Sequence, residues 1–316
     1  MIDMAITSER FIASVKRLTV MPSNQVLYKD NSDFLEMIHE KMTDKLVPIL
    51  DKLKQEYFVA TPVDIPLETG KYEYRFPSRS YGRKFREIKL VTSDGNCIAN
   101  FPQIPLEREH LYQAVSLPWG FRFQGDRIVI VGAPDPGYII RVWWFLPPSK
   151  PVLASAAGVI QSIVGDDITL TATPPDTFVP NALFDLIDKD GMSQCIAIDQ
   201  EATNVSGNTV SFATGTVSTL DLRPGDYLAL AGESPVLQVP QTAMPFLRTL
   251  VAYEALLSIS DSEASDRLEK LLKAEEKELL ALQANRADGE PTILINMNGF
   301  ARRGRGIRGI GIGRGY

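Results

Sequence analysis

The sequence predicts an α+β protein, with N- and C-terminal helices forming a bundle, antiparallel β regions inserted between them, and an extended C-terminal arm. Three observations predict this class. Apolar residues recur every three or four positions at both ends of the chain, which is the period of amphipathic helices. Between residues 57 and 240 they alternate and are separated by turn residues, which indicates strands. Residues 291–316 are so rich in glycine and arginine that they favour no packed element of their own.

The first part, residues 1–56, is expected to contribute two helices to the bundle. Residues 8–18 form the first, with one apolar stripe made by Phe11, Ile12, Val15 and Leu18. The second runs from about 32 to 54, and its apolar positions are Phe34, Ile38, Met42, Leu46, Ile49 and Leu53. Pro48 should kink this helix or begin a new segment, because its ring clashes with the preceding turn.

Residues 57–150 are predicted to form an antiparallel β region. Alternating stretches indicate strands at about 72–76, 85–92, 97–101, 121–124, 127–132 and 138–146. Turn sequences separate them at 68–70, 93–95, 124–126 and 134–137. Such short connections leave no room for crossover helices, so the strands should run antiparallel.

A second β domain is predicted over residues 151–240. The preceding stretch Leu146–Pro151, LPPSKP, is a natural seam because it cannot pair as a central strand. Residues 182–187 fit either a strand or one helical turn. The other strands are expected at 159–164, 167–173, 195–199, 209–213 and 226–231. Many Thr, Val and Ile residues favour a small antiparallel barrel or sandwich.

Helices return in residues 241–289. The first carries the apolar residues Phe246, Leu247, Leu250, Val251, Leu256 and Leu257. The second continues to about Ala287, with Gly289 just past its end, and its apolar residues are Leu268, Leu271, Leu272, Leu279, Leu280 and Leu282. Because these helices and the N-terminal ones are all amphipathic, the two ends of the chain should close one bundle.

Charge is unevenly distributed along the chain. The formal net charge is −6, but residues 291–316 contain five arginines and no acidic residue. Without those arginines, 28 basic residues remain against 39 acidic ones, a charge of −11 for residues 1–290. An acidic body with a basic arm, residues 290–316, suits self-assembly or docking on an acidic partner.

The chemistry-bearing residues form no catalytic constellation, so we expect a non-enzyme without cofactor or metal. The two histidines, His39 and His110, have no ligand partners at metal-site spacing and are expected in surface or capping roles. Gly304–Gly309 matches G-x-G-x-x-G, but it follows no predicted strand and precedes no helix. We therefore interpret it as an accident of composition.

Cysteines and apolar runs bear on the compartment. Cys97 and Cys195 are expected to be two buried thiols in a reducing compartment, with a disulfide as the alternative. The N-terminus resembles no signal peptide, and no apolar run approaches the length of a membrane span. We expect synthesis in the cytoplasm and no membrane partner.

Three tryptophans are candidate interface aromatics: Trp119, Trp143 and Trp144. Trp143 and Trp144 are adjacent in one predicted strand and must point to opposite faces. At least one of them should therefore be a core residue, and the other is a candidate for an interface.

A series of weak signatures in a particular order covers nearly the whole chain. They are Asp33–Glu40, Tyr72–Pro77, Phe85–Leu90, Gly120–Ile130, Pro134–Pro136, Arg141–Pro148 and Pro224–Tyr227. In this order the chain resembles the head-to-tail adaptor proteins, or portal-to-tail connectors, of tailed double-stranded DNA bacteriophages. The second β domain goes beyond a minimal adaptor and is expected to face tail proteins or fibres.

The resemblance implies a structural virion protein at the portal vertex, made in the host cytoplasm. It implies a dodecameric ring of this chain that bridges the portal to tail or nozzle proteins, with double-stranded DNA passing through transiently during ejection. It also implies a C-terminal arm lying along the portal. The portal-binding candidates are then Arg302, Arg303, Arg305, Arg308, Arg314, Ile307, Ile310 and Tyr316.

Three other functions remain open from the residues alone, and one of them is a hydrolase without a recognised motif. Another is a carbohydrate- or protein-binding tail or baseplate module that uses the three tryptophans. The third is a nucleic-acid binder that uses the Arg-Gly arm, although the acidic body and the near absence of aromatics from the arm argue against it.

Overall fold

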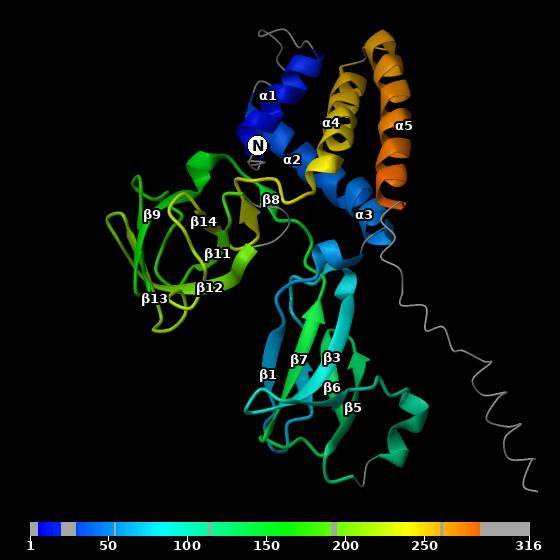
Figure 1. Cartoon of the computed structure of the whole chain (residues 1–316), viewed down its shortest axis with the longest axis vertical. Coiled ribbons are helices and arrows are strands. Elements are labelled where there is room, and N and C mark those ends of the chain that lie inside the picture. The colour runs from blue at the N-terminus through cyan, green and yellow to red at the C-terminus, as the bar shows by residue number, and fades with distance from the viewer. Residues whose placement is uncertain are drawn as a thin grey trace, which may run out of the picture.

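The computed structural model describes residues 6–19, 30–53, 55–112, 115–190, 195–259 and 262–284. Helices and strands both occur throughout these residues, so the α+β class is confirmed. Figure 1 shows three parts, with helices at one end, a β region at the opposite end, and a second β region to one side. The predicted arm lies outside the described residues, and with it all eight portal-binding candidates.

The N-terminal helical segment changes its winding just before Pro48. After α1 (Ser8–Thr19), the chain forms α2 (Asn31–Lys41), the π-helical turn η1 (Met42–Leu46) and α3 (Val47–Leu53). The proline ring would clash with the carbonyl of Asp44 in a regular α-helix, and the wider π turn lies at that point. The predicted change of segment at Pro48 is therefore confirmed.

Helices from both ends of the chain share one hydrophobic core. The C-terminal pair is α4 (Met244–Ser258) and α5 (Ser262–Ala284), and α4 packs against α1, α2 and α5 (Figure 1). Each large apolar side chain buried in this way contributes about 1.5–3 kcal/mol. Buried members of the core include Phe11, Val15, Phe34, Ile38, Leu247, Val251 and Leu268.

The first β region consists of two antiparallel sheets that enclose a common core. One sheet has the order β1–β7–β3–β4 and the other β2–β6–β5. The strands are β1 (Val63–Pro66), β2 (Glu73–Arg75), β3 (Phe85–Thr92), β4 (Cys97–Asn100), β5 (Pro118–Gln124), β6 (Arg127–Gly132) and β7 (Tyr138–Trp144). Buried side chains from the two sheets include Ile88, Ile140, Val142, Tyr74, Phe121 and Ile128. Strand β1 was not predicted, because prolines interrupt its sequence.

The second β region is a closed antiparallel barrel with the order β10–β13–β12–β11–β14–β9. Its strands are β9 (Gly158–Val164), β10 (Asp167–Leu170), β11 (Leu183–Ile187), β12 (Cys195–Ser206), β13 (Thr209–Phe212) and β14 (Tyr227–Leu230). The undecided stretch 182–187 is therefore the strand β11. The strand predicted at 195–199 continues to Ser206, because its second half pairs with β13 instead of β11.

The chain enters and leaves the barrel region side by side. Strand β8 (Lys150–Pro151) pairs in parallel with β15 (Glu233–Ser234). Beside them, the backbone N–H of Ser8 in α1 donates a 2.9 Å hydrogen bond to the carbonyl of Pro235. These contacts tie the base of the barrel to the helices. The remaining short 3₁₀ helices are η2 (Gln55–Phe58), η3 (Tyr81–Arg83), η4 (Leu106–Leu111), η5 (Ala154–Ala156) and η6 (Gln241–Ala243).

Candidate functional site

Trp143 and Trp144 lie on opposite faces of β7. Trp144 is 1% exposed and belongs to the core between the sheets. Trp143 is half-buried on the other face, where the ammonium of Lys89 lies 5.0 Å from its ring centroid. The prediction that one of the pair is a core residue is confirmed, and Trp144 is that residue.

Trp119 lies in an exposed apolar surface at the far end of the first β region. Its side chain is 52% exposed, and its ring stacks on Tyr112 with centroids 5.8 Å apart. Leu106 and Leu111 of η4 are more than 60% exposed, and Leu117 is nearly half exposed. We call Leu106, Leu111, Leu117 and Trp119 the distal apolar patch. Figure 1 places β5 at the end of the molecule opposite the helices. These four residues come from one short stretch of the chain, and exposed apolar side chains that gather into a patch mark interaction sites.

A buried ion pair joins the two β regions. Arg79 follows β2 in the first region, and its guanidinium donates hydrogen bonds of 2.8 Å to both carboxylate oxygens of Asp185 on β11. Asp185 is fully buried, whereas the Arg79 side chain is 20% exposed. Arg79 also donates a 2.9 Å bond to Asp199 on β12. Such a planar two-bond contact fixes the relative orientation of the two groups.

Backbone donors complete the environment of Asp185. The N–H of Asp199 donates to one carboxylate oxygen at 3.0 Å, and that of Gly232 donates to the other at 2.9 Å. Burial alone would lower the pKa of Arg79, but the hydrogen bonds and charges of Asp185 and Asp199 outweigh it and raise that pKa. Arg79 therefore stays charged at any physiological pH, and its contact with Asp185 acts as a structural clamp.

Cys195 lies next to this clamp, and its thiol has low reactivity. Its thiol is 3.8 Å from Asp185 and accepts a 3.2 Å hydrogen bond from the side-chain amide of Gln238. Burial, followed by the charge of Asp185, raises the pKa of this thiol to about 12. A thiol with so high a pKa is a poor nucleophile at neutral pH, because the thiolate is the reactive form.

The expectation of two buried thiols is correct for Cys195 and wrong for Cys97. Cys97 is exposed and both cysteines are free. Its strand β4 is at the edge of the four-stranded sheet, paired only with β3, so its side chains are covered less than those of a central strand. The alternative of a disulfide is not realised in this structure.

The histidines are placed differently from each other. His110 in η4 is exposed, as expected. His39 lies near the C-terminal end of α2 and is half-buried, so it is only partly at the surface, and its Nδ1 is buried and makes no capping hydrogen bond. Burial, followed by the charge of Lys150, lowers the pKa of His39. Among the described residues, no group of three or more His, Cys, Asp or Glu side chains could hold a metal ion.

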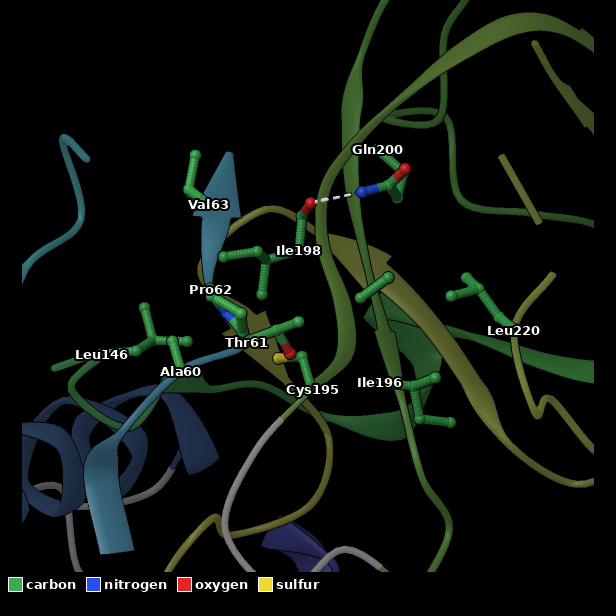
Figure 2. A pocket seen from close by; sticks show the side chains of 11 residues that line it. Ala60, Thr61, Pro62, Val63, Leu146, Cys195, Ile196, Ile198, Gln200 and Leu220 are labelled. Carbon is green, nitrogen blue, oxygen red and sulfur yellow. Dashed lines mark hydrogen bonds between the residues drawn. The ribbon is translucent and has the colours of Figure 1, made fainter. Parts of the chain in front are cut away.

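An apolar groove of about 290 Å³ lies between the two β regions, beside the clamp. Figure 2 shows β1 with Val63 on one side of it and β12 with Ile198 on the other. We call this the inter-domain groove. It is lined by Ala60, Thr61, Pro62, Val63, Leu146, Cys195, Ile196, Ala197, Ile198, Gln200 and Leu220. The walls are mostly aliphatic, so the groove suits an apolar segment better than a charged substrate.

Sequence reasoning missed the clamp and the groove. A signal for Asp185 was present, because a carboxylate within the apolar strand sequence LFDLI must be paired if the strand is buried. Nothing in the sequence pointed to Arg79, which is 106 positions away. Comparison of the sequence with protein-family models and with curated proteins finds no match to either. None of the helices in the described ranges is long and apolar enough to cross a bilayer.

Proposed function

We propose that this protein is a structural subunit of the ring that joins the portal to the tail in a tailed double-stranded DNA bacteriophage. The proposal includes the finer fold that the resemblance implies, a helical bundle closed by both ends of the chain with the β regions inserted. The core shared by α1, α2, α4 and α5 supports this arrangement. So does the return of the chain from the barrel to α1.

The observation that carries the proposal is the distribution of exposed apolar side chains over all three parts of the molecule. The distal apolar patch lies on the first β region. The barrel exposes Val164, Val179 and Leu183, and the helices expose Leu257, Leu271 and Leu280. A subunit of a closed ring makes head-to-tail contacts, so it needs two different, complementary surfaces, and a connector needs further surfaces above and below. Exposed apolar side chains on all three parts of the chain fit that requirement.

The negative charge of residues 1–290 supports a role as part of a conduit through which DNA passes. Residues 1–290 carry a formal charge of −11, which repels phosphates and keeps DNA from adhering to a conduit. The five arginines of residues 291–316 would then bind acidic groups of the portal. Twelve such arms on one portal ring gain avidity, so each contact can be individually weak.

The stacked pair Trp119 and Tyr112 favours a second candidate, a carbohydrate-binding tail module. Aromatic rings bind sugars when polar groups beside them hydrogen-bond the hydroxyls. The helix η4 exposes Leu106 and Leu111 together with the polar residues Glu107, Arg108 and His110. The large exposed apolar side chains favour a protein partner over a sugar.

Electron microscopy of the purified protein, alone and mixed with the portal of its phage, tests the proposal. We expect rings that dock coaxially on the portal. Removing residues 291–316 should leave a folded protein that no longer stays bound to the portal. A monomeric protein that does not bind the portal but binds oligosaccharides or RNA would contradict the proposal.

The variant Trp119→Asp tests whether the distal apolar patch is a subunit contact. It should abolish rings without unfolding the protein, because the side chain lies at the surface. Ile98→Asp is the matched control, since Ile98 is 48% exposed on β4 of the same β region. If Trp119→Asp still forms intact rings, the distal apolar patch is not part of the contact between subunits.

A further inference from the structure

The first half of β12 has a backbone edge that no other described strand covers. On one side, β11 pairs with it from Cys195 to Glu201. On the other side, pairing with β13 begins only at Ala202. Cys195, Ile196, Ala197, Ile198 and Gln200 from this half of β12 line the inter-domain groove, and Figure 2 shows the side chain of Ile198 directed toward it. Native proteins usually cover such edges or make them unable to pair, because unpaired backbone groups bind other strands.

One backbone carbonyl in this half of β12 is hydrogen-bonded to a side chain. The amide nitrogen of Gln200 donates a 2.6 Å hydrogen bond to the carbonyl of Ile198 (Figure 2). The carbonyl of Ile198 therefore accepts a hydrogen bond from a side chain, which an added strand would have to displace. Across the groove, β1 is also an edge strand, but Pro62 precedes it and Pro66 ends it. Prolines have no N–H to donate, so β12 is the edge that can accept a strand.

The floor and walls of the groove suit the side chains of an added strand. Leu146 comes from the end of the first β region, Leu220 from the loop after β13, and Pro62 from the approach to β1. A backbone edge beside apolar pockets is the arrangement used in strand addition, in which main-chain hydrogen bonds give affinity and pockets give specificity.

We infer that residues 291–297 of a second copy of this chain add as a strand to β12 and place their apolar side chains in the inter-domain groove. Ile293, Ile295 and Met297 alternate in this segment and would share one face of a strand. The open edge of residues 195–200 spans about 20 Å, which matches a strand of this length. The inference rests on the proposed function in requiring a neighbouring copy, and it assigns the start of the arm to that neighbour.

Charge favours this occupant over other extended segments. Residues 151–240 contain two basic residues, Lys189 and Arg223, and eleven acidic ones, a formal charge of −9. The segment 291–297 has no charge, and the five arginines that follow it would pass this acidic barrel before they reach the portal. Opposite charges on the two partners speed their encounter and select against acidic partners.

The chain length sets a geometric requirement. Six residues separate Ala284, the last residue of α5, from Pro291. Fully extended, they reach about 20 Å. The neighbour's α5 must therefore end within about that distance of the groove.

Photocross-linking of the full-length protein tests the inference. Ile295 is replaced by p-benzoyl-phenylalanine, and unlabelled chains are mixed with nitrogen-15-labelled chains before assembly. After irradiation, mass spectrometry should find cross-links from position 295 to residues 195–200 or Leu220. The two peptides joined in such a cross-link should include pairs in which one is labelled and the other unlabelled. The same cross-linker at Ile312, later in the arm, is the control and should not label the groove.

Two variants of the groove give opposite expectations in the same experiment. Leu220→Arg places a cation in the groove and should lower the cross-link yield about tenfold, which is about 1.4 kcal/mol of binding. Gln161→Arg, at an exposed position on β9 outside the groove, should leave the yield unchanged. Gln200→Ala frees the carbonyl of Ile198 and should raise the yield. Thermal melting of each variant confirms that it is folded.

The outcomes separate this inference from the proposed function. Rings that form without a cross-link to the groove overturn the inference and leave the ring subunit intact. If chains cross-link to one another at the groove but the protein forms no ring, the strand addition to β12 is supported and the proposed ring subunit is contradicted. Cross-links confined to a single chain overturn the assignment to a second copy, as does an unchanged yield with Leu220→Arg.

Discussion

The guanidinium of Arg79 and the carboxylate of Asp185 are 106 positions apart in sequence, yet two parallel 2.8 Å hydrogen bonds join them between the β regions. Asp185 has no exposed surface, and its carboxylate accepts hydrogen bonds from Arg79, from two backbone N–H groups and from the thiol of Cys195. Taking these charges out of water costs free energy, and this cost makes the loss of one partner severe. The pair thereby fixes the barrel against the first β region and shapes the inter-domain groove.

Arg79→Ala should lower the free energy of unfolding by about 3–5 kcal/mol, because it leaves the carboxylate of Asp185 buried without its cation. Chemical denaturation followed by intrinsic fluorescence measures the change. The control is Arg141→Ala, which breaks an exposed pair with Asp64 that also has two hydrogen bonds, both of 2.7 Å. Exposed pairs contribute about 0–1 kcal/mol, so equal losses for the two variants would contradict a buried clamp.

Asp166→Asn should reduce the loss of stability in acid. The backbone N–H groups of Ser218, Gly215 and Val217 donate to Asp166 and lower its pKa to about 2. The unfolded chain therefore binds a proton at higher pH than the folded one, and the stabilisation is fully present above the ordinary pKa of about 3.8. It is lost as the pH falls from about 4 through 2.

Melting temperatures between pH 2 and 5 measure this effect. Asp167→Asn is the control, because it removes the adjacent carboxylate but none of the three hydrogen bonds to Asp166. A slope of melting temperature against pH that is the same in Asp166→Asn and in the wild type would contradict the assignment.

Alkylation with iodoacetamide at pH 8 should modify Cys97 and spare Cys195. Cys97 is exposed, whereas Cys195 is 7% exposed with a pKa of about 12. At that pH about one Cys195 thiol in 10⁴ is ionised. Intact-mass spectrometry should find one adduct in the native protein and two after denaturation, and rapid double labelling of folded protein would contradict the buried site.

Gly132→Ala should destabilise the protein more than Gly125→Ala. Both glycines have positive φ, +97° and +62°, which costs a residue with a Cβ about 1–2 kcal/mol. Only at Gly132 would the Cβ collide with backbone, 2.3 Å from the carbonyl oxygen of Leu117 in the distal apolar patch. We expect a further loss of stability there and weakened ring formation, whereas Gly125→Ala should show the conformational cost alone in denaturation experiments.

Several elements could be predicted because their signals are local. The alternation of FREIKLVT predicts β3, and the structure has that strand at Phe85–Thr92. The glycine at 125 indicates a turn, and its positive φ there is the reason that glycine suits it. Strand β1 escaped prediction because Pro62 and Pro66 reduce the strand signal, although an edge strand tolerates them.

Burial was harder to predict than secondary structure. Alternation indicates which side chains share a face, and it placed Trp143 and Trp144 on opposite faces of β7. It does not tell which strand ends at an edge, so the exposure of Cys97 was not foreseen. The half-burial of His39 beside Lys150 likewise depends on the packing of β8 near α2, which are distant in sequence.

The sequence by itself determined the α+β class, the order of helices and strands, the turns between them, and the asymmetry between an acidic body and a basic arm. These properties follow from hydrophobic period, backbone preference and charge within short windows of the chain. Only the tertiary structure decided that Asp185 meets Arg79, that the edge of β12 stays open beside β1, and that the leucines of η4 remain exposed with Trp119. Each of these depends on surfaces brought together from distant segments, and no local pattern records which of them will meet.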